Sequence, residues 1–146
     1  MVDTLTKDQI DHILRSQIIG RIGCNAYGKT YIVPVAFVFD GKHIYAHSKE
    51  GMKIRMMREN PNVCFQIDII ENMVNWRSVI IWGKYEELKS TSLQLKAFKL
   101  LKDRFTPFVT SESVKPSQGT ESVEKQLRAV LFRILVTEQS GQYEKN

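Results

Sequence analysis

A strand-to-helix junction near the middle of the chain holds the side chains best suited to binding an anion. In the stretch IYAHSKEGMKIRMMRENP, we expect a strand to end at His47 and Ser48 and a helix to begin near Gly51, with Lys53 in its first turn. Unpaired backbone N–H groups and the positive end of the helix dipole favour a phosphate at such a position. The junction therefore predicts a phosphate site, although each side chain alone also fits a solvated or structural role.

Aromatic side chains could stack on a planar ring elsewhere in the chain. Tyr31, Phe37, Trp76 and Trp82 are the candidates, and core or interface packing is the default interpretation of each. Trp76 stands two residues before Ser78 at the expected start of a strand. This position favours a place at the rim of a pocket.

The sequence has no familiar set of catalytic side chains. It contains no His/Asp/Ser set, no HExxH and no carboxylates paired at a meaningful spacing, and Asp68 and Glu71 are expected to be solvated. Cys24 and Cys64 belong neither to a CxxC motif nor to a Cys/His cluster. We therefore interpret both as buried thiols and expect no metal site.

The composition indicates one soluble globular domain over residues 1–146. No basic segment followed by an apolar run opens the chain, and no apolar run is long enough to span a bilayer, so we expect a cytoplasmic protein without a membrane partner. A formal charge of +5 favours anionic partners in general. The basic residues are not interleaved with aromatics in a stripe, which argues against nucleic acid and leaves a small-molecule phosphate.

Three helices are expected. The first is amphipathic and runs from about Lys7 to Ser16, because Thr6 and Gln9 have capping-box spacing, and we expect it to be a lid or a brace and not part of the core. A second helix should cover 50–59 and end at Asn-Pro. A third should run from about Thr91 to Arg104.

Many short strands with few helices indicate a mainly β barrel or sandwich. The second predicted strand is apolar on both alternating faces, so it should be covered on both sides, and its Pro34 implies an edge, a bulge or a gap in the sheet. We expect a loop over 106–125 and a frayed tail over the last ten residues. The predicted strands are 18–26, 30–41, 42–47, 62–69, 77–88 and 129–136.

Two stretches together resemble a known family. The succession YIVPVAFVFDGKHIYAHSKEGMKIRMMRENPNVCFQID, followed by NWRSVIIWGKYEEL, is similar to the FMN-binding split barrels related to pyridoxamine 5'-phosphate oxidase. The pattern is closest to the nitroimidazole-resistance branch and runs from about Ile18 to Leu88. The resemblance implies a six-stranded antiparallel split β-barrel with flanking helices. It also implies a homodimer with flavin at the interface.

The resemblance also assigns a cofactor site. It implies that backbone in the second strand lies against the isoalloxazine ring, that the junction holds the phosphate, and that the W-x-S-V motif reaches the flavin. His47 further matches a histidine that the nitroimidazole-resistance branch places near the flavin, and it is the one possible catalytic side chain. The implied FMN-binding residues are Pro34, Val35, Ala36, Phe37, His47, Ser48, Gly51, Lys53, Trp76 and Ser78.

The implied function is that of an FMN-dependent oxidoreductase acting on a small organic acceptor, such as a nitro compound. Pyridoxamine 5'-phosphate oxidases close with an Arg-containing segment that grips the substrate phosphate, whereas this chain ends VLFRILVTEQSGQYEKN. Vitamin B6 oxidation is therefore not expected. The alternative, from another functional class, is a non-catalytic protein that binds or senses flavin or haem, because fold alone does not separate the two.

Overall fold

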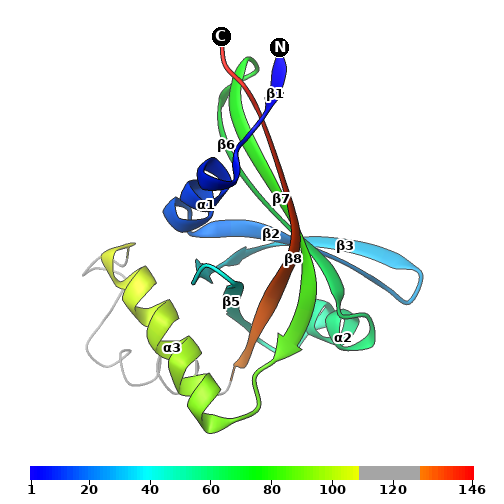
Figure 1. Cartoon of the computed structure of the whole chain (residues 1–146). Helices are drawn as coiled ribbons and strands as arrows, with labels where there is room; N and C mark the ends of the chain where they lie inside the picture. The colour runs from blue at the N-terminus through cyan, green and yellow to red at the C-terminus, as the bar shows by residue number, and fades with distance from the viewer. Residues whose placement is uncertain (109–128) are drawn as a thin grey trace.

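The computed structural model describes residues 1–108 and 129–146, which form one curled antiparallel sheet with three helices around it (Figure 1). Of the loop expected over 106–125, all but a short 3-10 turn at Thr106–Phe108 lies outside the described residues. In chain order the elements are β1 (Val2–Thr4), α1 (Lys7–Ser16), β2 (Ile19–Ala26), β3 (Lys29–Ala36), β4 (Val38–Phe39), β5 (His43–Ser48), α2 (Met52–Glu59), β6 (Asn62–Asn72), β7 (Asn75–Glu87), α3 (Thr91–Phe105) and β8 (Val130–Glu144).

The sheet curls into a barrel that is split at one residue. The strand order is β3-β2-β6-β7-β8-β5-β4, so β3 and β4 stand at opposite ends of the order although Phe37 alone separates them in the chain. The two ends of the sheet must therefore meet at Phe37. Its side chain is fully buried and packs edge-on against Phe65, with 4.9 Å between the ring centroids.

The predicted mainly β class is confirmed, and the strand count is larger than the six expected. The second predicted strand is wrong as a single element, because the chain bends at Phe37 and its two parts pair with different neighbours. Pro34 does lie on an edge strand, since β2 is the one partner of β3 among the described strands. The turn between these strands, Tyr27-Gly28, has positive φ at both residues, as a tight two-residue hairpin requires.

The chain end is a strand and not the expected frayed tail. β8 continues to Glu144 because β7 supplies a cross-strand partner along nearly its whole length, up to the pair Trp76 and Glu144. At its far end β8 also pairs with β1, a strand that sequence patterning did not indicate. The two long strands thus extend past the barrel and bring both termini to one end of the molecule (Figure 1).

α1 contributes to the core, contrary to the expectation that it would not, although it also covers the domain as a lid would. The capping box is present, with Thr6 Oγ1 accepting from Gln9 N at 3.2 Å and Thr6 N donating to Gln9 Oε1 at 2.8 Å. The apolar face of the helix is buried against the sheet, at Ile10, Ile13 and Leu14. α1 therefore closes one end of the barrel.

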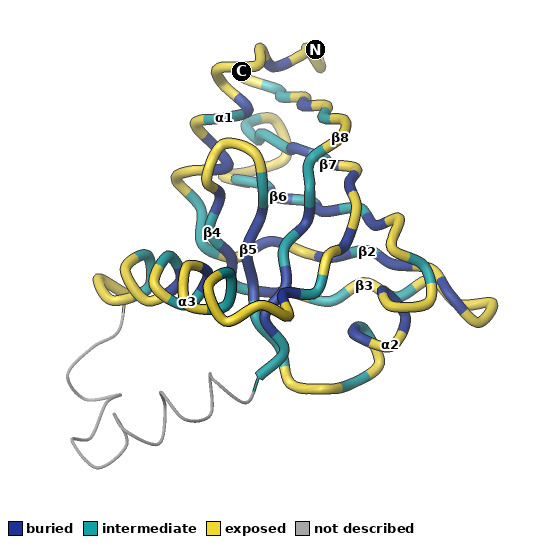
Figure 2. Tube along the Cα trace, turned by 60° about the horizontal axis from the view of Figure 1, so that its bottom comes forward, coloured by how far each residue is buried: buried dark blue, intermediate teal, exposed yellow. Residues whose placement is uncertain are grey.

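The other helices occupy different positions on the sheet. α2 packs against β2 at the end of the molecule away from α1 and both termini, and α3 covers β5 (Figures 1 and 2). Beneath α3 lies a second, smaller apolar cluster of Tyr45, Leu88, Ala97, Leu101 and Leu131. None of the helices in the described ranges has the length and apolar content needed to cross a membrane.

Candidate functional site

The N-terminus of α2 presents backbone donors that no side chain caps. Gly51 is the N-cap residue, its φ of −176° is extended, and it makes no side-chain capping hydrogen bond. The first helical bond runs from Arg55 N to Gly51 O at 3.1 Å, so the N–H groups of the first turn have no intrahelical acceptor. These groups and the helix dipole point to an anion as the natural partner.

Two basic side chains, His47 and Lys53, share this junction and are half-buried. Burial lowers the pKa of His47, and the nearby charge of Lys53 lowers it further. Burial likewise lowers the pKa of Lys53. Within residues 1–108 and 129–146, no carboxylate forms an ion pair with either side chain. The junction is thus cationic and partly desolvated, an environment that a bound anion would relieve.

The thiol of Cys24 lies close enough to Lys53 for the charge of Lys53 to affect its pKa. Burial raises the pKa of Cys24, and the Lys53 charge acts in the opposite direction. Cys24 is buried as predicted, and its Sγ is 3.8 Å from the Tyr31 carbonyl oxygen. Cys64 departs from the prediction, because it is only half-buried and lies on the outer face of the sheet. Neither thiol is paired in a disulfide.

An ionic network holds the segment that leads into α2. Arg58 near the end of the helix binds Glu50 before the helix and, at 2.7 Å, Glu87 on β7. The Tyr85 hydroxyl donates to the same Glu87 carboxylate at 2.9 Å. Sequence patterning missed this arrangement, because its members are up to 37 residues apart and meet only when α2 packs beside β7.

The Ser48 hydroxyl and the backbone just after β3 have hydrogen-bond partners within the chain. The Ser48 hydroxyl donates to the Lys49 carbonyl at 2.9 Å, so its proton is directed at the neighbouring backbone. Pro34 is exposed on the edge strand, whereas Val35 is buried. The N–H of Phe37 donates to the Ile18 carbonyl at 3.0 Å. The exposed backbone of this segment therefore centres on Pro34 and Ala36.

Trp76 and Ser78 lie far from the α2 junction within one chain. Trp76 pairs with Ile70 beside the tip of the β6–β7 hairpin, whereas Tyr85 N donates to the Pro61 carbonyl just after α2, at 2.8 Å. Tyr85 is the ninth residue after Trp76 along β7, which corresponds to roughly 30 Å of strand. A single chain therefore does not bring the predicted site residues together.

One outer row of the sheet carries exposed apolar side chains. Gly23 pairs with Ile32 on one side and with Cys64 on the other, and Cys64 pairs with Trp82, so all three side chains point the same way. Ile32 is 67% exposed and Trp82 40% exposed, and the row borders an open cavity of about 440 Å³. The expectation that both faces of the second strand are covered is therefore not met within one chain.

A polar network continues this outer face. Arg21 donates to Gln66 and to Asp68, each at 3.2 Å. Gln66 in turn donates to Asp68 at 3.0 Å and to Ser78 at 3.1 Å. Arg21 pairs with Pro34 across the strands. The network was not predicted, but the alternation of side chains along β2 and β6 could have placed Arg21 and Gln66 on this face.

Comparison with known proteins gives consistent matches. The family model described as pyridoxamine 5'-phosphate oxidase matches residues 6–143. An uncharacterised protein of Rhizobium meliloti (strain 1021) is 31% identical over 90 residues, which are 62% of this chain and 60% of that protein. The chain thus spans about three fifths of the length of this relative.

Two solved structures share the fold over almost the whole chain. A FAD-binding protein from Mesorhizobium loti is 29% identical, with a TM-score of 0.79 and 99% of each chain covered. A candidate 5-nitroimidazole antibiotic resistance protein from Bacteroides thetaiotaomicron is 19% identical, with a TM-score of 0.75, 98% of this chain and 87% of that chain covered.

Proposed function

This chain belongs to the pyridoxamine 5'-phosphate oxidase family, and on that premise we propose that it binds FMN and reduces a small organic acceptor. The observation that carries the proposal is the pair of half-buried basic side chains, His47 and Lys53, at the uncapped N-terminus of α2. No described carboxylate pairs with them. A phosphate monoester supplies the missing negative charge and accepts several hydrogen bonds at once.

Three kinds of group at the α2 junction would bind the phosphate. Lys53 contributes the positive charge, the first-turn N–H groups contribute fixed donors, and the Ser48 hydroxyl can turn from the Lys49 carbonyl to the phosphate. The Arg58–Glu87 ion pair keeps α2 beside β7. The junction is thus supported by packing outside the phosphate site itself.

The isoalloxazine ring fits against the exposed edge strand β3. Pro34 has no N–H, and within residues 1–108 and 129–146 no strand pairs with Pro34 or Ala36 on the side away from β2. A flat ring can therefore lie against this backbone without leaving an amide donor of Pro34 unpaired. Bound flavin would supply the electron-transfer chemistry, and the protein would supply orientation and shielding from water.

A homodimer would complete the site. Trp76 and Ser78 lie toward the tip of the β6–β7 hairpin, away from Lys53, so they could reach the same flavin only from a partner subunit. The exposed apolar row of Ile32, Cys64 and Trp82 offers a surface for that contact. Two antiparallel copies would place Trp76 of the partner subunit near the α2 junction, and each dimer would then hold two flavins.

His47 is the junction side chain suited to moving a proton. Its pKa lies below the ordinary value of 6.5, so the imidazole is neutral at pH 7 and can accept a proton. If it faces the phosphate it strengthens FMN binding as a donor. If it faces the ring, it can pass a proton from its surroundings to the acceptor that is being reduced.

The relatives support a flavin and, less directly, a nitro compound as acceptor. The similar protein from Mesorhizobium loti binds FAD, and the one from Bacteroides thetaiotaomicron is associated with 5-nitroimidazole resistance. Both flavins carry the phosphate that the α2 junction would bind. We choose FMN over FAD because the α2 junction provides donors for one phosphate group.

An absorbance spectrum of freshly purified protein, with mass analysis of the released ligand, tests the proposal. We expect flavin bands, a released mass equal to that of FMN, and reduction of a nitroaromatic compound that exceeds any turnover of pyridoxamine 5'-phosphate. A released mass equal to that of FAD would change the cofactor. A Soret band without flavin would replace the proposal by the alternative of a haem-binding protein.

A further inference from the structure

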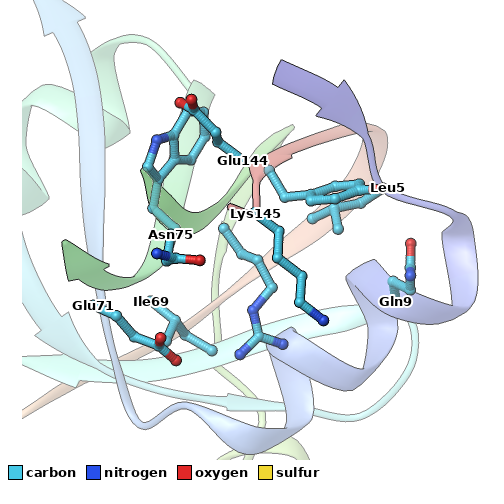
Figure 3. Close-up of a pocket in the computed structure, with 10 residues that line it drawn as sticks. Leu5, Gln9, Ile69, Glu71, Asn75, Glu144 and Lys145 are labelled. Carbon is cyan, nitrogen blue, oxygen red and sulfur yellow. The ribbon is translucent and has the colours of Figure 1, made fainter. Parts of the chain in front are cut away.

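A second cavity, of about 430 Å³, opens at the end of the molecule away from α2. It lies where α1, the β6–β7 hairpin and the end of β8 meet, and Figure 3 shows side chains from all three around it, among them Gln9, Asn75 and Lys145. Its volume falls within the range of about 300 to 1,000 Å³ that is typical of small-molecule sites.

Arg77 is the principal cation of this cavity. It pairs across the strands with Ile69 and Tyr143, so its side chain shares their face of the sheet, the face that α1 covers. Arg77 is half-buried, and its guanidinium has no hydrogen bond or ion pair with any residue in the two described ranges, Asp8 in an adjoining cavity included. A partly desolvated, unpaired guanidinium favours a planar carboxylate, which it can bind through two N–H groups.

Other donors stand around the same space. The capping box binds Gln9 Oε1 to the Thr6 N–H at 2.8 Å, and Gln9 Nε2 makes no hydrogen bond in the described structure. The side chain of Lys145 points into the cavity in Figure 3 and adds an ammonium group to it. The cavity therefore contains hydrogen-bond donors that have no acceptor among the described residues.

Acidic side chains at the cavity limit how much negative charge it can accept. Glu71 and Glu144 both line it, and Glu144 lies 3.6 Å from the amino group of Met1. The Glu71 carboxylate would repel a ligand with two negative charges about twice as strongly as a single carboxylate, which Arg77 can neutralise. The charge pattern thus favours a monoanion over a phosphate ester.

The remaining walls are aromatic and aliphatic, at Trp76, Tyr143, Leu5 and Ile69. Such walls favour a flat, apolar body attached to the anionic group. We propose that this cavity binds a planar aromatic monocarboxylate, with its carboxylate held by Arg77 and Gln9 and its ring against Tyr143, which lies on the same face of the sheet as Arg77. Trp76 borders the cavity and is also the residue that a partner subunit would bring to the flavin, but Arg77 lies on the opposite face of β7. The proposed Arg77 contact therefore does not depend on the flavin site.

Calorimetric titration of the full chain with benzoate tests the proposal, with benzamide and phenyl phosphate as matched probes. We expect saturable binding of benzoate and weaker binding of both other compounds. Arg77→Gln should weaken benzoate binding about ten- to a hundredfold, because a hydrogen-bonded charge is lost. Arg21→Gln is the control, since Arg21 is already hydrogen-bonded to Asp68 on the outer face, and it should leave the affinity unchanged.

Tryptophan emission locates the bound probe. Trp76 and Trp82 are the two tryptophans of the chain, so the Trp82→Phe variant reports on Trp76 alone. Benzoate should change the emission of that variant and not that of Trp76→Phe. If Arg77→Gln proves unstable by thermal unfolding, Arg77→Lys retains the charge without the two-pronged contact, and we still expect weaker binding.

Several outcomes would overturn the proposal. They are equal affinity for benzoate and benzamide, tighter binding of phenyl phosphate, and an affinity that neither Arg77 variant alters. Competition between benzoate and added FMN would also overturn it, because it would show that the probe occupies the flavin site. Loss of flavin binding with benzoate binding intact would count against the proposed function alone.

Discussion

Lys53 is the residue on which the proposed phosphate contact depends most. Lys53→Ala should weaken FMN binding about ten- to a hundredfold, because a charge-assisted contact to phosphate contributes about 1.5 to 3 kcal/mol. Riboflavin, which lacks the phosphate, should bind the variant and the wild type almost equally. Fluorescence titration of both flavins measures the difference.

Lys49→Ala is the matched control, because Lys49 is exposed four residues before Lys53 and should leave FMN affinity unchanged. Equal losses of FMN and riboflavin affinity in Lys53→Ala would show instead that Lys53 supports the fold.

His47 should make stability depend on pH. Its pKa in the folded protein lies below the ordinary 6.5, so both folded and unfolded forms are neutral above that value. As the pH falls below 6.5, the unfolded chain takes up a proton that the folded site resists, and the free energy of unfolding falls. Urea unfolding from about pH 7.5 to about pH 5.5 should show this decline.

His47→Gln should reduce the decline without abolishing it, because burial also lowers the pKa of His43. Saturating FMN should reduce it as well, since a bound phosphate favours the protonated imidazole if it faces the phosphate. Parallel pH profiles for the wild type and His47→Gln would refute the assignment of this effect to His47.

Gly83 lies on β7 beside a β-bulge, whose extra residue, Thr137, belongs to β8. The β7–β8 register shifts between Trp82 and Gly83, and a Cβ at Gly83 would stand 2.3 Å from the Leu135 carbonyl oxygen. Gly83→Ala should therefore lower the free energy of unfolding by about 1 to 3 kcal/mol, because backbone must move. Chemical denaturation measures the change.

Gly51→Ala provides the comparison for this substitution. The nearest atom to a Cβ there is 3.8 Å away and the backbone is extended, so no clash arises, and the poorer capping by alanine should lower the free energy of unfolding by only about 0.5 kcal/mol. If Gly83→Ala proved as stable as Gly51→Ala, the distance between β7 and β8 at Gly83 would have to be larger than it is in the structure.

Assembly is the property of the whole molecule that the proposed function requires. Ile32→Asp should convert a homodimer into monomers and release the flavin, because it places a charge in the apolar outer row. The single chain should remain folded, since Ile32 is 67% exposed in it. Sedimentation velocity, followed at a flavin wavelength, records both changes.

Leu95→Asp, on the exposed surface of α3, should leave the mass and the flavin content unchanged. A stable wild-type monomer with flavin fully bound would contradict an interface site altogether.

Local sequence signals located most of the elements. Capping at Thr6, the Asn-Pro stop after α2 and the apolar alternation of the strands act within a few residues, so α1, α2, α3 and most strand cores lie where they were expected. The same local rules placed backbone donors and Lys53 together at the start of α2. The family resemblance was readable for the same reason, because its motifs are short and follow each other in order.

Long-range packing decided the rest. The break at Phe37 exists because the barrel closes there, β8 extends to Glu144 because β7 runs beside it, and α1 is buried because it covers the end of the barrel. Contacts between distant segments also separate Trp76 from Lys53 and bring Arg77 beneath α1. Side-chain patterns repeat every two or four residues, so they indicate which face is apolar but not which distant strand or helix will cover it.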